Sequence, residues 1–502
     1  MKQSNSIRTK MLIALFIIAG SGLSFGQNIQ DALRMSQQQY FSSARSAGVG
    51  SAYGAIGADF GSVSYNPAGV AAFRTSEFTF GFSMNNVNSN AQLKGSDVLV
   101  KTNTNQKLKL ENVGIVIFDE PGGDKWVNSN FAFGLNRTAN FDQKVKFNGQ
   151  TKGSFTDRFL ERANGKDLNG LDNFEGGLAY DVGAIYGPDN QLDYVSDYQK
   201  TPNNLLKKSQ NIHSRGGIYE MVFAYGASFQ DKLLFGLSVG IPFINYTEEK
   251  SYLEESIDAN SVLKKLEYDQ YLSTSGVGMN FKAGLIGRLS QNLRVGVSVH
   301  SPSYYTLQDD YHNEMLYEYY EDGLQSNLDG SPDGYFKYKF KSPWRYTGSI
   351  GGIFSIGELN VFIDADAEYA DYASSKFNFT AYSTAAGDEM NEKDQNENIR
   401  EQLESAITLR LGGELAYDKY RLRMGYVAPQ SPFGRDEIND VMPSYTLGLG
   451  FREWKYYIDL AFVKETTTYG YSPYELIDFD NEPFVDIERN RSKIMLTFGR
   501  KF

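Results

Sequence analysis

Apolar side chains recur at every second position in many segments of this chain. In residues 233–243 every odd-numbered position is apolar, while the even positions hold a leucine, two glycines, a serine and a proline. A period of two places alternate side chains on opposite faces of a β-strand. The alternation recurs in residues 219–229, 293–299, 407–415, 422–426, 445–451 and 494–502. The pattern predicts many strands, each with one apolar face.

These apolar faces carry few charges, which indicates that they contact lipid. Lysine or arginine at mid-membrane on such a face costs about 2–4 kcal/mol, and we expect the exception, Arg500, near an interface. The mean hydropathy of −0.43 is too low for a helical membrane protein. The 34 Phe, 34 Tyr and 49 Gly suit alternating strands with aromatic girdles instead. The predicted fold class is all-β, a transmembrane antiparallel β-barrel.

Both ends of the chain carry signals for export and assembly. Lys2, Arg8 and Lys10 precede an apolar run at 11–20, which predicts a signal peptide over residues 1–26, cut before Gln27. No later window approaches the roughly 20 apolar residues of a membrane-spanning helix. The last strand ends on Phe502, which resembles the C-terminal signal read by the barrel assembly machinery. We expect a multi-pass protein in the outer membrane of a Gram-negative bacterium, contacting lipid and lipopolysaccharide.

Charge and residue usage exclude other classes of protein. The net charge of −12 argues against a nucleic-acid partner, which needs a basic face. The absence of cysteine suits a chain that crosses an oxidising periplasm without disulfides. Asp309, Asp310 and His312 cluster without a recognised ligand spacing, so we predict no metal and no cofactor.

The alternating runs between residue 75 and the end number about a dozen to sixteen, and an even count suits a bacterial barrel. We predict 14 strands over residues 75–502. Long polar segments at 149–213, 248–271, 307–334 and 385–404 are expected to be extracellular loops, with a short surface helix at 391–403.

Residues 27–74 lack the strand pattern and are dense in Gly, Ala and Ser. The segments 47–53 and 59–70, with Asn66-Pro67-Ala68 at their core, resemble the N-terminal hatch of the FadL/TodX family of outer-membrane transporters. Further matches lie at residues 295–302, 342–344, 409–426 and 445–460. The resemblance implies that residues 27–74 form a hatch, or plug, inside the barrel.

The resemblance also implies a function, namely passive uptake of hydrophobic compounds, typically long-chain fatty acids, by a monomer. External loops would catch the ligand, which would leave sideways through a gap in the wall where a strand bends inward. Asn66, Pro67 and Ala68 would brace the hatch near that gap. From the residues alone, an ordinary Asn-Pro turn is an equal alternative.

Strand parity points several charged residues into the lumen. Arg294, Arg410 and Arg423 are candidates to meet a ligand carboxylate, although a salt-bridged network lining a polar interior is the favoured alternative. An apolar path would need loop residues such as Phe155, Phe159 and Leu160, which could equally form the packing of their own loop.

Enzymatic functions find little support. Residues 236–240 match a hydrolase nucleophile motif, but that motif needs a strand, a sharp turn and a helix, whereas here it lies inside an alternating strand. His300 and Ser298 share the lumen-facing parity, unlike the lipid-facing pair of a barrel lipase. We therefore predict no enzyme. Two alternatives remain: a barrel adaptor that binds secreted protein cargo, and a hydrophilic porin, which a hatch argues against.

Overall fold

The computed structural model describes residues 28–39, 41–105, 108–121, 125–187, 192–200, 204–384, 386–433, 439–477 and 482–502. The predicted signal peptide, with its cleavage position before Gln27, lies outside these residues. Among the residues described, no helix is long and apolar enough to cross a membrane.

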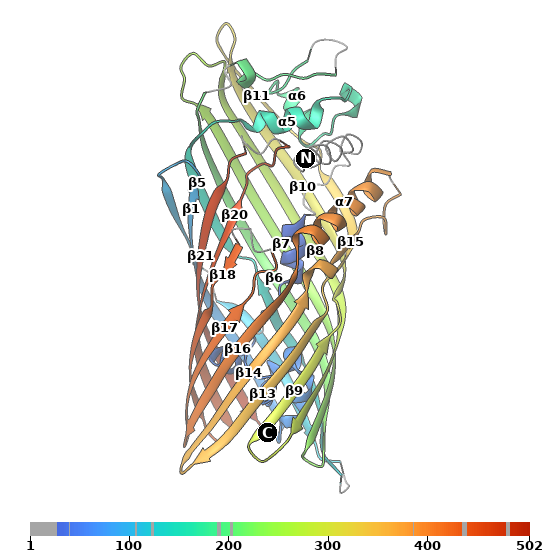
Figure 1. Ribbon diagram of the computed structural model, residues 1–502, viewed down its shortest axis with the longest axis vertical. Helices are drawn as coiled ribbons and strands as arrows, with labels where there is room; N and C mark the ends of the chain where they lie inside the picture. Colours follow the sequence, from blue (N-terminus) through green and yellow to red (C-terminus); the bar gives the residue numbers. More distant parts are fainter. Residues whose placement is uncertain are drawn as a thin grey trace, which may run out of the picture.

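The described strands close into an antiparallel barrel of 14 strands, as predicted (Figure 1). The last strand pairs with the first along its whole length, from Glu77 opposite Lys501 to Leu93 opposite Val485. In order around the barrel the strands are β1 (Glu77–Leu93), β3 (Lys109–Asp119), β4 (Trp126–Asn140), β6 (Leu206–Phe229), β7 (Leu233–Ser256), β8 (Leu263–Arg288), β9 (Leu293–His300), β13 (Arg345–Ile356), β14 (Leu359–Asp371), β16 (Ser405–Tyr417), β17 (Tyr420–Pro429), β19 (Ser444–Arg452), β20 (Tyr456–Tyr471) and β21 (Val485–Lys501).

Other strands extend the wall at the end opposite to the C-terminus. They are β2 (Leu99–Asn105), β5 (Gln143–Thr151), β10 (Tyr304–Tyr320), β11 (Leu324–Gly330), β12 (Gly334–Lys341), β15 (Lys376–Asn378) and β18 (Asn439–Val441). The helices α5 (Phe155–Ala163) and α6 (Gly176–Asp181) lie over this end, and α7 (Ala386–Gln402) lies obliquely beside it (Figure 1). Short 3-10 turns complete this region: η2 (Leu168–Gly170), η3 (Tyr198–Lys200) and η4 (Tyr372–Ser374).

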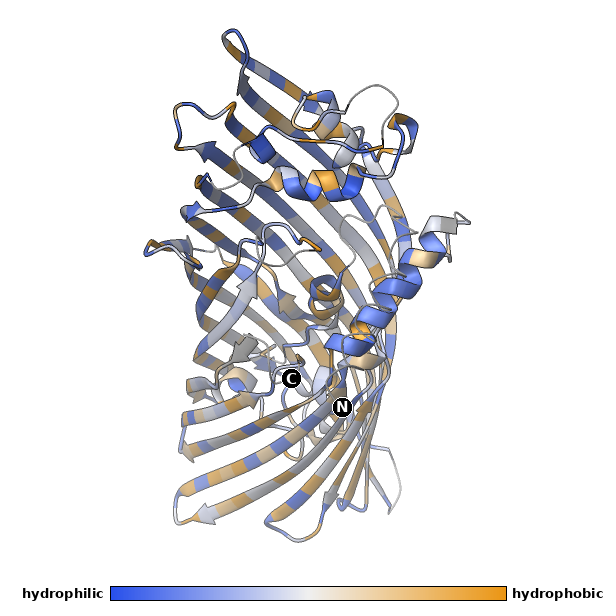
Figure 2. Ribbon diagram, turned by 45° about the horizontal axis from the view of Figure 1, so that its top comes forward, coloured by the Kyte–Doolittle hydropathy of each residue, from blue (hydrophilic) through white to orange (hydrophobic). Residues whose placement is uncertain are grey.

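The predicted apolar faces point outward in the part of the barrel nearer the C-terminus. Along β7, Phe235, Leu237 and Phe243 are exposed on the outer surface, while the alternate residues face the lumen. Along β8, Val277, Met279 and Phe281 are exposed in the same way. Figure 2 shows the resulting bands of hydrophobic and hydrophilic residues along the strands. This apolar belt is the surface that meets lipid.

Beyond the belt, the polarity of the two faces is reversed along the same strands. The outward positions of β8 change to Ser275 and Ser273, and its inward positions change from Asn280 and Lys282 to Tyr268 and Leu266. Leu266 and Tyr268 belong to a buried cluster with Phe155 and Phe159 of α5. The upper wall, as we name this part, is therefore a water-facing extension with its own core.

This upper wall corrects the prediction of long loops. Residues 248–271 and 307–334 are mostly strand, because β7 runs on to Ser256, β8 starts at Leu263 and β10 with β11 forms a hairpin. Strands of 24 to 26 residues greatly exceed the 9–11 or so needed to cross a membrane. The predicted surface helix exists as α7, which is longer than expected.

The N-terminal segment lies inside the barrel. The helix α2 (Ile29–Ser36) packs at mid-height in a cluster with Ile218, Ile244 and Tyr338 of the wall. Below it, α3 (Ala44–Gly48), α4 (Ser62–Tyr65) and the 3-10 helix η1 (Pro67–Ala72) occupy the lumen of the lipid-facing barrel (Figure 1). The proposed boundaries of this plug, residues 27 and 74, stay a prediction.

Single cysteines can test the reversal of polarity, because the native chain has none. Ser273→Cys and Ser275→Cys should react with a membrane-impermeant maleimide on intact cells, since their positions face water. Met279→Cys and Phe281→Cys should stay unlabelled in the folded protein, because lipid covers them, and should react after denaturation. Labelling at all four positions of the folded protein would contradict the assigned height of the belt.

Candidate functional site

The plug contacts the wall through backbone, and glycines make this possible. The backbone of Pro67 lies directly on Gly236 of β7 and the Asn66 side chain on Gly284 of β8, where an added β-carbon would collide with them. A β-carbon on Gly226 of β6 would lie 2.6 Å from the backbone nitrogen of Ala71. These three glycines are paired neighbours across β6, β7 and β8.

Other strands of the wall repeat the arrangement. Gly412 and Gly425, which pair across β16 and β17, face the backbone of Val49 and Gly50. A β-carbon on Gly296 of β9 would lie 2.5 Å from the carbonyl oxygen of Gly54. We name these wall residues the glycine belt: Gly226, Gly236, Gly284, Gly296, Gly412 and Gly425.

The predicted Asn66-Pro67-Ala68 motif forms the start of η1. The Asn66 side chain accepts a hydrogen bond from the Ala68 N–H at 3.1 Å and donates one to the Gly54 carbonyl at 2.7 Å. Pro67 occupies the first position of the 3-10 helix, where its missing N–H has no cost. The motif thus packs against β7 and β8, and its position beside an exit stays a prediction.

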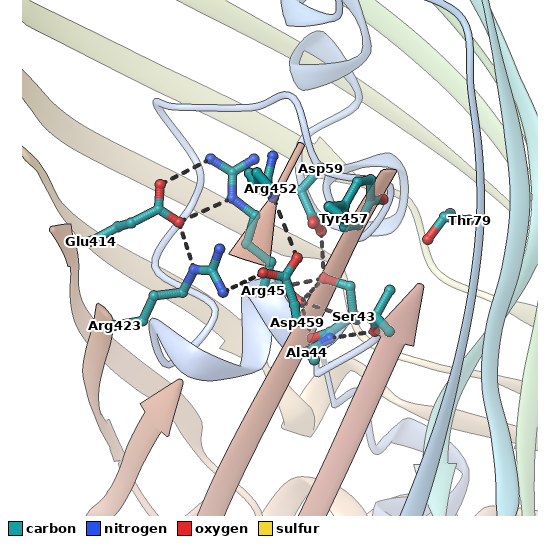
Figure 3. Close-up of polar contacts among 12 residues, drawn as sticks. Ser43, Ala44, Arg45, Asp59, Thr79, Glu414, Arg423, Arg452, Tyr457 and Asp459 are labelled. Atoms are coloured by element: carbon teal, nitrogen blue, oxygen red, sulfur yellow. Dashed lines mark hydrogen bonds and ion pairs between the residues drawn. The ribbon is translucent and has the colours of Figure 1, made fainter. Parts of the chain in front are cut away.

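Buried ion pairs tie α3 to the wall (Figure 3). The Arg45 guanidinium lies 3.4 Å from Glu414, which also pairs with Arg423 at 2.5 Å. Arg423 in turn donates to Asp459 at 2.7 Å. The side chain of Arg423 is fully buried, so its charge needs both carboxylates.

A second group of polar contacts lies next to the first, around β14 and β16. Arg410 donates to Glu368 at 3.0 Å and to the Tyr65 hydroxyl at 2.9 Å, and Arg294 donates to the Ile56 carbonyl at 3.4 Å. All three predicted arginines therefore contact the plug or a wall carboxylate, as expected of a structural network. Their role in binding a ligand carboxylate stays a prediction.

Two wall carboxylates hold plug backbone, a role that parity could not reveal. Asp366 accepts from the N–H of Tyr53 at 3.1 Å, and Asp364 accepts from the N–H of Ala55 at 3.1 Å. His300 also faces the plug, with its Nε2 2.7 Å from the Tyr65 carbonyl oxygen. Residues 236–240 lie within the unbroken strand β7.

The wall ladder is interrupted between β3 and β4. Their pairing runs from Asp119 opposite Ser129 to Asn112 opposite Asn136, and no pair with β3 is described beyond that point. The next residue, Arg137, is level with Tyr219 of β6 and Phe243 of β7. The interruption thus lies at the upper border of the apolar belt.

Plug and wall groups cover this interruption. The Gln39 N–H, just after α2, donates to the Thr138 carbonyl of β4 at 2.6 Å. Arg137 lies 3.6 Å from Glu111, which pairs with Lys493 at 2.8 Å. The free edge of β4 is therefore occupied by the plug segment in the conformation described.

A cavity of about 880 Å³ lies in the upper wall. Its floor includes Ile29, Asp31 and Arg34 of α2, and its lining includes Arg158 and Arg162 of α5. The amide side chains of Gln395, Asn398 and Gln402 of α7 also reach it. Among the described lining residues, polar groups predominate.

The three predicted loop residues have different positions. Phe155 lines the cavity, and its ring also packs 4.6 Å from that of Tyr474 and 5.1 Å from that of Tyr252. Phe159 and Leu160 are buried in the core of the upper wall. The Phe159 ring lies 5.6 Å from that of Tyr268 of β8, and Leu160 belongs to the same cluster, so an apolar path along these residues stays a prediction.

The charges at the roof of the cavity are paired. Glu175, at the start of α6, lies 3.1 Å from Arg162 and 3.5 Å from Arg158. Burial raises the pKa of the Glu175 carboxyl, and the two arginines oppose this rise. Burial also lowers the pKa of Lys166, which follows α5. The roof therefore holds its cations close to a carboxylate.

Gly236→Ala tests the contact between plug and wall. The added methyl group collides with the backbone at Pro67, and overpacking of this kind costs about 1–3 kcal/mol. We expect a lower denaturant midpoint for the purified barrel. Gly348→Ala on β13 is the matched control, because a β-carbon there has open space around it. Equal midpoints for the two variants would contradict a close-packed plug.

Comparison with known proteins supports the architecture. No protein-family model and no curated protein matches the sequence. The toluene transporter TodX of P. putida superposes with a TM-score of 0.52 at 12% identity, over 92% of this chain and 98% of that one. A Pseudomonas aeruginosa FadL homologue gives a TM-score of 0.54 at 10% identity, over 93% of this chain and 100% of that one. This chain therefore has the plugged-barrel fold of FadL- and TodX-type proteins.

Proposed function

We propose that this protein is a passive outer-membrane transporter of hydrophobic small molecules, with long-chain fatty acids as the ligands to test first. Two similar structures support the class of compound, since one is described as a toluene transporter and the other as a FadL homologue. The hatch-like motif at Asn66 to Ala68 supports the same class. No catalytic step is part of this proposal.

The interrupted ladder between β3 and β4 is the observation that carries the proposal. It lies at the upper border of the apolar belt, where an apolar molecule leaving the lumen would meet lipid instead of water. An apolar ligand gains free energy by that transfer. A lateral exit at this position therefore needs no energy source.

The helix α2 connects the cavity to this exit. It forms part of the cavity floor, and Gln39, three residues after its end, covers the free edge of β4. A shift of this segment would open the floor and uncover the edge together. We propose that the plug acts as the gate in this way.

We also propose a location and partners for the protein. The outward apolar belt suits the outer membrane with its lipid and lipopolysaccharide. The exposed ring of Phe502 is available to the barrel assembly machinery. We propose a monomer; the 14-stranded ring is closed by β1 and β21 of one chain, so no second chain is needed to complete the wall.

A disulfide across the gate tests the transport route. Gln39→Cys with Thr138→Cys should form a bond, because the two backbones are hydrogen-bonded there. In cells that lack their own transporter, the oxidised double variant should take up labelled oleate about tenfold more slowly than the reduced one. Each single variant is the control and should not respond to reductant. Equal uptake by the oxidised and reduced double variant would exclude this gate.

The second candidate function is an adaptor for secreted protein cargo. One observation favours it: the backbone N–H and C=O of Phe377 in β15 bond to the Asn396 side chain of α7 at 2.9 and 3.0 Å. A side chain thus stands where a neighbouring strand would pair, and an extended cargo segment could replace it.

Asn396→Leu should then expose this edge and increase capture of cargo. The measurement is a pull-down of secreted proteins by the tagged barrel from culture medium. Lys393→Leu, at an exposed position of the same helix, is the control. Unchanged capture by Asn396→Leu, together with normal uptake of oleate, would leave transport as the function.

A further inference from the structure

Four of the five cations among the described lining residues of the upper cavity are paired with carboxylates, and burial lowers the pKa of the fifth, Lys166. On the floor Arg34 is paired with Asp31, and on the wall Lys250 lies 3.0 Å from Glu248. At the roof Arg158 and Arg162 share Glu175. To pair with one of these four cations, an incoming carboxylate would have to displace its acid and leave that acid buried and unpaired, which is costly.

Further carboxylates make the cavity unfavourable for anions. Asp172, Glu475 and Glu482 also line it, so acidic groups outnumber basic ones among its described residues. The Asp172 carboxylate is held in place by the backbone N–H groups of Phe174 and Gly176, at 3.0 and 3.2 Å. A negative ligand would enter a region of negative charge.

Neutral hydrogen-bonding groups fill much of the remaining lining. Gln143, Gln270, Gln395 and Asn398 present amides, each with donors and acceptors. Tyr311 adds a ring face and a hydroxyl. A hydroxyl group both donates and accepts, so a neutral head with several hydroxyls can satisfy such a lining without any change of charge.

The cavity also offers an apolar surface to a hydrocarbon chain. Ile29 of α2, Val145 of β5, Ile212 of β6 and Leu272 of β8 line it. Its volume of about 880 Å³ lies within the common range for small-molecule sites, about 300–1,000 Å³. A ligand with a polar head and a short chain therefore fits its chemistry.

We propose that this cavity selects amphiphiles with a neutral, hydroxylated head, such as monoacylglycerols, over fatty-acid anions. This inference rests on the proposed function and narrows its substrate class. The pairing of Arg158 and Arg162 with Glu175 is the device that excludes a ligand carboxylate.

The test is calorimetric titration of the full barrel in lipid nanodiscs with two soluble ligands. 1-Monooctanoylglycerol and octanoate carry the same acyl chain and differ in the charge of the head. At neutral pH the glycerol ester should bind about tenfold more tightly than the anion. Equal or tighter binding of octanoate, or no binding of either ligand, would overturn the proposal.

Glu175→Gln tests the role of the roof acid. The substitution keeps the shape of the side chain and leaves both arginines without their carboxylate. The preference for the ester over octanoate should fall by about tenfold. Glu397→Gln, at an exposed position of α7 outside the cavity, is the matched control and should keep the native preference. A native preference in Glu175→Gln would refute the assigned device.

A variant that removes the roof cations instead of the roof acid separates a charge effect from misfolding. Arg158→Gln with Arg162→Gln should increase the preference for the ester, because the roof then becomes more acidic. A loss of structure would weaken both ligands together, whereas changes of preference in opposite directions require a charge effect. Parallel changes in the two variants would count against the proposal.

Failure of this inference and failure of the transport proposal give different results. If the disulfide between positions 39 and 138 blocks uptake but octanoate binds as well as the ester, only the selectivity is wrong. If the ester is preferred but the disulfide has no effect on uptake of labelled ester or oleate, the cavity binds such molecules without passing them through this gate.

Discussion

The close contact between plug backbone and wall backbone determines most of this structure. At the glycine belt the wall has no side chains, so the plug lies directly on it at Pro67, Val49 and Gly54. The wall carboxylates Asp364 and Asp366 can then bond to plug amides. This packing fixes α3 and η1 in the lipid-facing barrel, and with them the chain that leads to α2. The cavity floor and the cover of the β4 edge both depend on that position.

The reversal of polarity along β7 and β8 divides the molecule into two environments. In the lower part the lipid requires apolar side chains outside, and the plug accepts polar ones inside. In the upper part water surrounds the wall, and the side chains that face inward form a core with α5. One strand therefore faces lipid along its lower part and water along its upper part. On β8 this change of polarity lies at Gly276 and Gly278. The cavity and the interrupted ladder both lie near this transition.

The alternation of apolar and polar side chains, with the signals at the two chain ends, was enough to predict the barrel, its 14 strands and its apolar faces. They failed in the upper wall, because there the apolar residues, such as Leu266 and Tyr268, have the parity that faces the lumen below. Parity correctly placed Arg423 inward, but it could not show that Glu414 and Asp459, on two other strands, hold its charge. Phe155 and Phe159 were recognisable as apolar, whereas their packing against Tyr252 and Tyr268 depends on contacts across about a hundred residues of sequence. The cavity is formed by elements from the whole chain, so no local pattern reveals it.

The ion pair between Arg45 and Glu414 has a consequence for biogenesis. The two residues are 369 positions apart, and the carboxylate at Asp459 lies further still along the chain. The plug is synthesised before the wall, yet Arg45 has no carboxylate partner until Glu414, in the last third of the wall, exists. The contact of α3 with the wall can therefore form only once β16 to β20 are present. A segment made before the wall is thus fixed by strands made near the end of the chain, so a chaperone that holds the segment unfolded until then would favour correct assembly.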